Sequence, residues 1–178
     1  MRILVTGGTG YIGSHTCISL LEKGYDVTIV DNLVNSKALV VDRIEALSGK
    51  KVKFFEADVC DAAALRRIFA EDEIFAVIHF AGLKAVGESV QIPLRYYENN
   101  LVSTLSLLQV MEEFKVKNFV FSSSATVYGN PASVPIREDF PLSTTNPYGT
   151  TKLMIERILL DYCLLYTSPS PRDKRQSR

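Results

Sequence analysis

The chain has 178 residues, of which 47% are hydrophobic and 22% are charged. This length suits one domain with a hydrophobic core, and the composition is that of an ordinary globular protein rather than a disordered one. Twenty basic residues balance twenty acidic ones, so we do not expect the chain to bind nucleic acid.

The cysteines and histidines argue against a metal site and against a disulfide framework. Cys17, Cys60 and Cys163 are odd in number, and with His15 and His79 they show no metal-ligand spacing. The apolar start "RILVT" is too short for a secretory leader or a membrane span. We therefore expect a reduced, cytoplasmic protein with no metal and no membrane partner.

Short apolar runs alternate with helix-compatible segments along the chain. Strands are predicted for residues 2–6, 26–31, 52–58, 75–82 and 118–124, and helices between them include 12–23 and 94–114. The strand runs are almost continuously apolar, which is typical of strands covered on both faces of a sheet. Alternating strands and helices imply right-handed crossovers, so the pattern predicts an α/β fold with a doubly wound, Rossmann-like parallel sheet.

A glycine-rich turn follows the first predicted strand. In "TGGTGYIGSH" (6–15) the glycines at 7, 10 and 13 let the backbone turn tightly and approach a pyrophosphate at a helix N-terminus. Asp31 ends the second predicted strand 18 residues beyond Gly13. Its carboxylate can accept hydrogen bonds from both ribose hydroxyls and would repel a 2′-phosphate. A plain tight turn is the structural alternative, but the flanking elements favour a dinucleotide, and Asp31 favours NAD over NADP.

Two further strand ends are expected at the same edge of the sheet, because ligands lie beyond the carboxyl ends of parallel strands. Asp58 and Val59 end the third strand and could contact the adenine. "FAG" (80–82) ends the fourth strand and offers small residues beside the cofactor. Acids and glycines end many strands for structural reasons alone, so both interpretations stay open here.

The stretch "NPYGTTK" (146–152) places a tyrosine and a lysine four positions apart. Pro147 suits the first turn of a helix, and Tyr148 and Lys152 then share one face. That face continues through Ile155 and Leu159, so we expect it to be buried. A buried ammonium is costly unless its charge is used, and it favours the phenolate form of a nearby tyrosine. A phenolate beside a hydride acceptor is a general base for oxidising an alcohol.

Five segments carry a resemblance to a known family: "TGGTGYIGSH", "DNLVNS", "HFAGLKAVGES", "FSSSATVYG" and "YGTTK". Together they resemble the extended short-chain dehydrogenase/reductase family, and within it the UDP-glucose (UDP-galactose) 4-epimerase family. The resemblance runs from Met1 to about Tyr162. It implies an isomerase that uses NAD to interconvert UDP-glucose and UDP-galactose by transient oxidation at the sugar C4, and a homodimer at full length.

The resemblance also implies roles for individual residues. Tyr148 would be the general acid/base, Lys152 would hold the nicotinamide ribose and tune that tyrosine, and Ser124 would hydrogen-bond the reacting oxygen, so that Ser124 and Tyr148 both bind substrate. The cofactor-binding residues that it implies are Gly7, Gly10, Tyr11, Ile12, Gly13, Asp31, Asn32, Leu33, Val34, Asn35, Ser36, Asp58, Val59, Phe80, Ala81, Gly82, Leu83, Lys84, Asn99, Ser124, Tyr148 and Lys152.

After Tyr162 the resemblance ends at "CLLYTSPSPRDKRQSR". We therefore expect residues 1–162 to form an NAD-binding domain that is truncated relative to the family, with its C-terminal part missing. Residues 163–178 are rich in Pro, Ser and Arg, and we expect a disordered, non-native tail there. Such a fragment would be inactive alone.

Other functions fit the sequence less well or stay open. Sugar-nucleotide 4,6-dehydratases need an Asp-Glu pair after the serine segment, where this chain has Ala125, Thr126 and Val127. UDP-glucuronate decarboxylases and uronate epimerases stay open, although "HFAGLKAVGES" fits them less well. A non-catalytic NAD-binding module is also open, but it has no use for Tyr148 beside Lys152.

Overall fold

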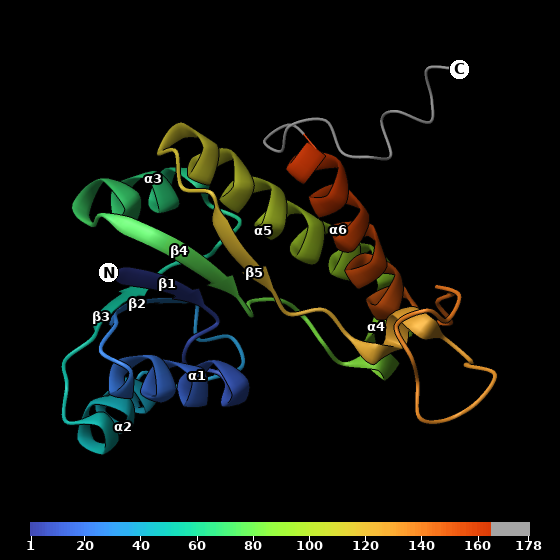
Figure 1. Cartoon of the computed structure of the whole chain (residues 1–178), viewed down its shortest axis with the longest axis horizontal. Helices are drawn as coiled ribbons and strands as arrows, with labels where there is room; N and C mark the ends of the chain where they lie inside the picture. The colour runs from blue at the N-terminus through green and yellow to red at the C-terminus, as the bar shows by residue number, and fades with distance from the viewer. Residues whose placement is uncertain (165–178) are drawn as a thin grey trace. The chain divides into compact units, whose positions relative to one another are not determined.

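The computed structural model describes residues 1–164 of the chain (Figure 1). The strands are β1 (Arg2–Thr6), β2 (Asp26–Asp31), β3 (Lys53–Glu56), β4 (Ile74–His79) and β5 (Asn118–Phe121). The helices are α1 (Tyr11–Glu22), α2 (Leu39–Ser48), α3 (Ala62–Glu71), α4 (Val86–Gln91), α5 (Pro93–Glu113), the short 3₁₀ helix η1 (Ala125–Tyr128) and α6 (Pro147–Leu164).

These elements divide into two compact units. The sheet unit consists of Met1–Leu83 with Glu98–Ser122, and the helical unit consists of Lys84–Tyr97 with the chain from Ser123 onward. The sequence had suggested a single domain over 1–162. The helix α6 continues through Leu164, so Cys163 and Leu164, which the sequence assigned to the tail, are helical. The rest of the predicted tail, 165–178, lies outside the described residues.

The sheet unit confirms the predicted fold class. Its five strands are all parallel, in the order β3-β2-β1-β4-β5. Helices α1 and α2 cover one face, and α3 and α5 lie on the other (Figure 1). The strand order reverses at β1, so the loops after β1 and β4 meet at the switch point of the sheet, where such folds bind ligands.

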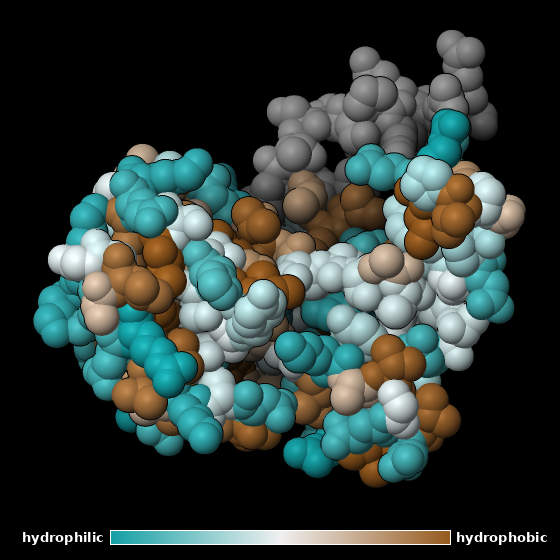
Figure 2. Space-filling view, turned by 90° about the horizontal axis from the view of Figure 1, so that it is seen from below, coloured by the Kyte–Doolittle hydropathy of each residue, from teal (hydrophilic) through white to brown (hydrophobic). Residues whose placement is uncertain are grey.

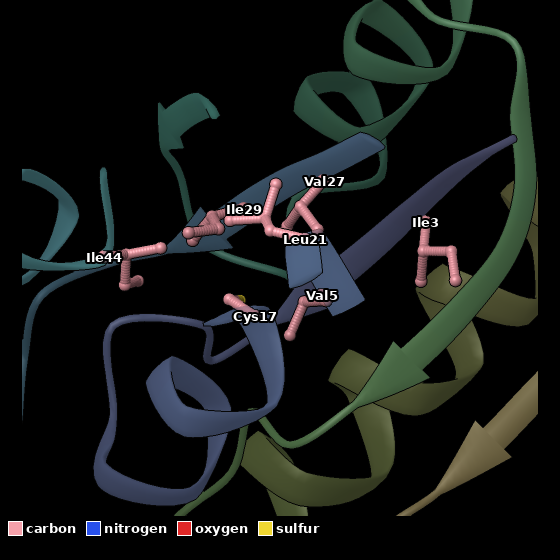
Figure 3. Close-up of a cluster of buried hydrophobic side chains, with 7 residues drawn as sticks. All are labelled: Ile3, Val5, Cys17, Leu21, Val27, Ile29 and Ile44. Atoms are coloured by element: carbon pink, nitrogen blue, oxygen red, sulfur yellow. The ribbon is translucent and has the colours of Figure 1, made fainter. Parts of the chain in front are cut away.

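Apolar side chains from β1, β2, α1 and α2 form a core cluster on the face of the sheet that α1 and α2 cover. Figure 3 shows this cluster of buried residues, which consists of Ile3, Val5, Cys17, Leu21, Val27, Ile29 and Ile44. Burial raises the pKa of Cys17 to about 12, so the thiol stays protonated at neutral pH. Cys17 is therefore a small hydrophobic residue of the core.

His79 ends β4 and is fully buried rather than available to a metal. Its Nδ1 lies 2.7 Å from the hydroxyl of Thr6, and its Nε2 lies 3.2 Å from the hydroxyl of Thr104. Hydrogen bonds at both ring nitrogens, one donated and one accepted in the neutral form, satisfy a buried imidazole and fix its orientation. The ring thereby links β1, β4 and α5 just below the carboxyl edge of the sheet.

Three predicted strands end earlier than the apolar runs indicated. The runs 52–58, 75–82 and 118–124 end as strands at Glu56, His79 and Phe121. The residues beyond each end turn out of the sheet instead of continuing it. These positions include Asp58, residues 80–82 and Ser124, which the sequence assigned to cofactor or substrate, so the apolar runs overestimate the length of the strands there.

In the helical unit, a loop between η1 and α6 is held close to η1. The backbone N of Ser143 donates to the carbonyl of Val127 at 2.9 Å. Gly129 has φ +55°, and an added Cβ would lie 1.9 Å from the Ser143 carbonyl oxygen. Only glycine fits this position without moving the loop that leads into α6.

Among helices up to residue 164, none combines the length and the apolar character needed to cross a membrane. Figure 2 shows hydrophobic residues interspersed with hydrophilic ones on the face that it presents.

Candidate functional site

The glycine loop between β1 and α1 is shaped by close contacts of its own backbone. Gly7 has φ +67°, and an added Cβ there would lie 2.8 Å from the backbone N of Ala81. At Gly13 an added Cβ would lie 2.2 Å from the carbonyl oxygen of Gly7. Gly10 precedes α1, and no side chain caps the first turn of that helix. The loop therefore presents backbone and an uncapped helix N-terminus, which together favour an anion.

Asp31, at the end of β2, joins this loop to the segment after β2. Its Oδ2 accepts a hydrogen bond from Thr9 N at 3.1 Å, and its Oδ1 accepts from Leu33 N at 3.0 Å and from Ser36 Oγ at 3.1 Å. A carboxylate offers about four acceptor positions, so this arrangement leaves one for a further donor. Asp31 thus holds the loops together, a role that the sequence did not reveal.

The end of β3 is tied to the same segment. Asn32 Nδ2 donates to Asp58 Oδ2 at 3.2 Å, and Cys60 N donates to Asp58 Oδ1 at 2.8 Å. The Asp58 side chain is exposed, whereas Val59 beside it is buried. Of this pair, Asp58 is the residue that a ligand at the sheet edge could reach.

The segment after β4 is held by Thr6 of β1 and by Asn100 of α5. Ala81 N donates to Thr6 Oγ1 at 3.3 Å, which keeps the segment against β1. Leu83 N donates to Asn100 Oδ1 at 2.8 Å, and Asn100 Nδ2 donates to the Leu83 carbonyl at 3.0 Å. The predicted residue Asn99 donates to the same Asn100 Oδ1 at 3.0 Å. Asn100 is buried and was missed, although two adjacent asparagines inside a helix are unusual enough to draw notice.

A surface pocket of about 530 Å³ opens between the glycine loop, α1 and α2. Its lining includes four predicted cofactor residues, Gly10, Tyr11, Asn35 and Ser36. The ring of Tyr11 packs edge-on against His15 with centroids 5.1 Å apart. The sheet unit therefore brings the glycine loop and the segment after β2 to one hollow.

In the helical unit, Ser124 caps the short helix η1. Its Oγ accepts from Thr126 N at 3.2 Å and from Thr126 Oγ1 at 2.9 Å. Thr126 was not singled out from the sequence, where a threonine in a loop carries no signal of its own.

Tyr148 and Lys152 lie on the first turns of α6, whose start is well defined. Pro147 is the first helical residue, and Asn146 Oδ1 accepts from Gly149 N at 2.8 Å. Lys152 is only 5% exposed, and this burial lowers the pKa of its ammonium to about 8. The predicted burial of this lysine is therefore correct, and its cost is visible in the pKa.

The first turn of α6 packs tightly against η1. A Cβ added to Gly149 would lie 3.0 Å from the carbonyl oxygen of Thr126 and 3.1 Å from its Oγ1. This close approach brings the Ser124–Thr126 segment and the turn that contains Tyr148 together within one unit.

A second link joins the start of the helical unit to the same helix. The hydroxyl of Ser123 donates to the carboxylate of Glu156, which lies one turn after Lys152 on α6. Ser123 and Ser124 thus use their hydroxyls for different partners. The sequence "SSS" alone does not indicate which serine hydroxyl binds which partner.

Lys84 lies in the same unit, before a segment fixed by a buried tyrosine. Tyr96 is fully buried, and its hydroxyl donates to Glu88 Oε2 at 2.5 Å and accepts from Ala85 N at 3.1 Å. Burial and the neighbouring carboxylate raise the pKa of Tyr96 to about 12, so it stays a neutral donor. Across residues 1–164 no group of three or more His, Cys, Asp or Glu residues could hold a metal ion.

The fold and these residues define an α/β protein of the doubly wound class, with a glycine loop at the switch point of its sheet. The protein-family model described as GDP-mannose 4,6 dehydratase matches residues 4–170, and the chain belongs to that family. Among curated proteins, it is 62% identical to the UDP-glucose 4-epimerase of Bacillus subtilis over 161 residues, which cover 90% of this chain and 48% of the relative. It is 59% identical to the UDP-glucose 4-epimerase of Dictyostelium discoideum over 162 residues, which cover 91% of this chain and 47% of the relative.

Solved structures give the same result. The UDP-glucose 4-epimerase from Bifidobacterium longum, in complex with NAD+ and UDP, superposes with a TM-score of 0.93 at 55% identity, over 96% of this chain and 51% of that chain. The enzyme from Brucella ovis, in complex with NAD, has a TM-score of 0.85 at 40% identity, over 93% of this chain and 48% of that chain. The predicted resemblance to the UDP-glucose 4-epimerases is confirmed, and the chain spans about half the length of the relatives it matches.

Proposed function

We propose that this chain forms the NAD-binding part of an isomerase that interconverts UDP-glucose and UDP-galactose. The observation that supports this best is the buried Lys152 one turn after Tyr148, in a chain that is 62% identical to a UDP-glucose 4-epimerase. Relatives of known structure were crystallised with NAD and with UDP or a UDP-sugar. Activity, substrate and partners are proposals for the full-length protein, because the chain spans about half of its relatives.

The residues of the sheet unit fit a dinucleotide. The glycine loop leaves its backbone accessible at an uncapped helix N-terminus, which suits a pyrophosphate. Asp31 is positioned by Thr9, Leu33 and Ser36 to accept one further hydrogen bond, which suits a ribose hydroxyl and disfavours a 2′-phosphate. Of the other cofactor contacts proposed from the sequence, Val59 is buried and is left out of the proposal, and the rest are retained.

The chemistry needs an acid/base group that works near neutral pH. NAD, when bound, would supply the hydride acceptor and donor for the sugar C4. Tyr148 would take the proton from the C4 hydroxyl and later return it. At pH 7, below its pKa of about 8, most of Lys152 is protonated. Lys152 would hold the nicotinamide ribose, and Ser124 would hydrogen-bond the reacting oxygen.

A dehydratase is the alternative that the family description raises. The segment after Ser124 reads Ala125, Thr126, Val127 and Tyr128, with no carboxylic acid to protonate a leaving hydroxyl. Redox-neutral epimerisation needs no such acid. The curated relatives named above are epimerases, which agrees with this difference.

We also propose that the full-length protein is a cytoplasmic homodimer that binds neither nucleic acid nor membranes. Apolar side chains are exposed on α5, at Leu94 and Leu105, and on α6, at Met154 and Leu160, and a second copy could cover them. Sedimentation of the full-length protein would decide the oligomeric state.

The test of the function is turnover by the full-length protein with Tyr148→Phe. Loss of a general acid/base should lower kcat for UDP-galactose by about 10²- to 10⁴-fold, while NAD binding stays close to wild type. Tyr128→Phe, in the same unit, is the matched control and should keep normal turnover. Normal turnover in Tyr148→Phe would contradict the assignment, and no turnover by the wild type would contradict the function.

A further inference from the structure

The hydrogen bonds around Ser124 restrict what its hydroxyl can do. A serine hydroxyl has one donor and two acceptor positions. Thr126 fills both acceptor positions, with its backbone N at 3.2 Å and its Oγ1 at 2.9 Å. The one capacity left to Ser124 is its own proton.

Thr126 is itself held in place on two sides. Its carbonyl accepts from Gly129 N at 3.2 Å, and the residue lies close to Gly149 on the first turn of α6. Val127, the next residue, is buried. The orientation of the Thr126 hydroxyl is therefore set by the packing of η1 against α6 and needs no bound substrate.

We infer that Thr126 is a positioning residue that fixes the Ser124 hydroxyl as a hydrogen-bond donor toward the oxygen on the sugar C4. The inference rests on the proposed function, which places that oxygen next to Ser124. It adds a residue and a direction to that function: Ser124 donates to the substrate and does not accept from it.

The direction of the hydrogen bond from Ser124 matters because the hydrogen-bonding capacity of the reacting oxygen changes during the reaction. As an alcohol it can donate and accept, but as its proton leaves for Tyr148 it gains negative charge and ends as a carbonyl oxygen, which only accepts. A fixed donor stabilises the charge that develops in the transition state. A serine that is free to rotate would accept from the alcohol part of the time and stabilise the starting state instead.

The experiment compares three variants of the full-length protein. Thr126→Val keeps the shape of the side chain and removes its hydroxyl, and Thr126→Ser restores a hydroxyl. Thr144→Val makes the same chemical change at another hydroxyl of the helical unit, whose partner is Thr150 Oγ1 at 2.7 Å. The measurements are kcat and KM for UDP-galactose and the position of Ser124 Oγ in a crystal structure without cofactor or substrate.

We expect Thr126→Val to lower kcat about tenfold with KM changed less than twofold, because only the transition state loses stabilisation. Thr126→Ser and Thr144→Val should stay near wild type. The crystal structure of Thr126→Val should show Ser124 Oγ rotated away from residue 126, and that of Thr126→Ser should not.

Several results would overturn the inference. They are an unchanged kcat in Thr126→Val, a loss that Thr126→Ser fails to restore, or a Ser124 side chain that does not move. If the wild-type protein itself turned over no UDP-sugar, the proposed function would be wrong. The crystallographic position of Ser124 would still decide whether Thr126 controls it.

Discussion

The glycine loop of the sheet unit and the first turns of α6 in the helical unit are constrained by different physical effects. In the loop, backbone atoms pack so closely that a Cβ on Gly13 would lie 2.2 Å from a carbonyl oxygen. On α6, a lysine is 5% exposed, and its burial lowers the pKa to about 8. The first region depends on shape and the second on the free energy of a buried charge. Substitutions in the loop should therefore act independently of pH, and substitutions of the lysine should not.

The largest effect is expected for Gly13→Ala. The new methyl group would overlap the Gly7 carbonyl oxygen, so the loop or α1 must move, and we expect the free energy of unfolding to fall by about 3 kcal/mol. Urea unfolding should give the same loss at pH 7 and pH 9, and NAD binding should be lost.

Gly87→Ala is the matched control, because nothing lies within 4 Å of the added Cβ in α4. It should change the free energy of unfolding by about 1 kcal/mol or less, in the stabilising direction. A Gly13→Ala protein that bound NAD with normal stability would show that the loop is not built by backbone contact.

The second prediction concerns Lys152→Met and has the opposite sign for stability and activity. The pKa of Lys152 is about 8 in the folded protein against an ordinary value of 10.5, so the unfolded chain binds more protons between these pH values. The stability of the wild type should therefore rise as pH increases from about 8 to 10.5, and the cost of the buried charge is fully present below pH 8. At pH 7 the substitution should stabilise the protein without cofactor by about 3 kcal/mol and abolish turnover.

The measurement is the difference in free energy of unfolding between Lys152→Met and wild type at pH 7, 9 and 10. This difference should shrink as pH rises. Lys23→Met, at an exposed lysine at the end of α1, should show no comparable trend. A difference for Lys152→Met that did not depend on pH would mean that burial of the ammonium is not costly.

In both regions the sequence predicts the local pattern but not the side-chain contacts. The alternation of strands and helices, the glycine spacing and the Tyr148–Lys152 pair are local patterns, so the doubly wound parallel sheet, the glycine loop and the buried lysine could be predicted from them. The three donors to Asp31 and the bonds from Thr126 to Ser124 depend on side-chain orientations that no spacing encodes. Asn100 holds Leu83 from 17 positions away, and such contacts appear only when the loop and the helix are placed.

The third prediction sharpens the role of Asp31. A 2′-phosphate would lie against this carboxylate, so wild type should bind NAD more tightly than NADP by about 10- to 100-fold, or roughly 1–3 kcal/mol. Asp31→Ser should reduce this difference in affinity, because it weakens NAD binding and removes the repulsion between the carboxylate and the 2′-phosphate of NADP. It should also lower stability, because Thr9 N and Leu33 N lose their acceptor.

Titration of both cofactors into wild type and Asp31→Ser would give the ratio. Asp58→Ser is the control, since it removes a carboxylate at the next strand end and should weaken both cofactors about equally. Equal affinities of the wild type for NAD and NADP would refute the role assigned to Asp31.

The smallest effects are expected at two helix caps, one in each unit. Asp61 Oδ1 accepts from Ala63 N at 2.9 Å and from Ala64 N at 3.1 Å at the start of α3. Asn146 Oδ1 accepts from Gly149 N at 2.8 Å at the start of α6. Each substitution to Ala should lower the free energy of unfolding by about 1 kcal/mol, because each removes one capping side chain.

Turnover should distinguish the two caps where stability does not. The cap at residue 146 fixes the turn that contains Tyr148, so Asn146→Ala should lower kcat of the full-length protein several-fold with little change in KM. The Asp61→Ala protein should keep the kcat of the wild type, because α3 contributes no proposed catalytic residue. An equal loss of turnover in both variants would mean that lower overall stability causes the loss. The cap at residue 146 would then have no specific role in the geometry of the first turn of α6. If neither lost turnover, the packing of Gly149 against Thr126 would be sufficient to hold Tyr148 without the cap.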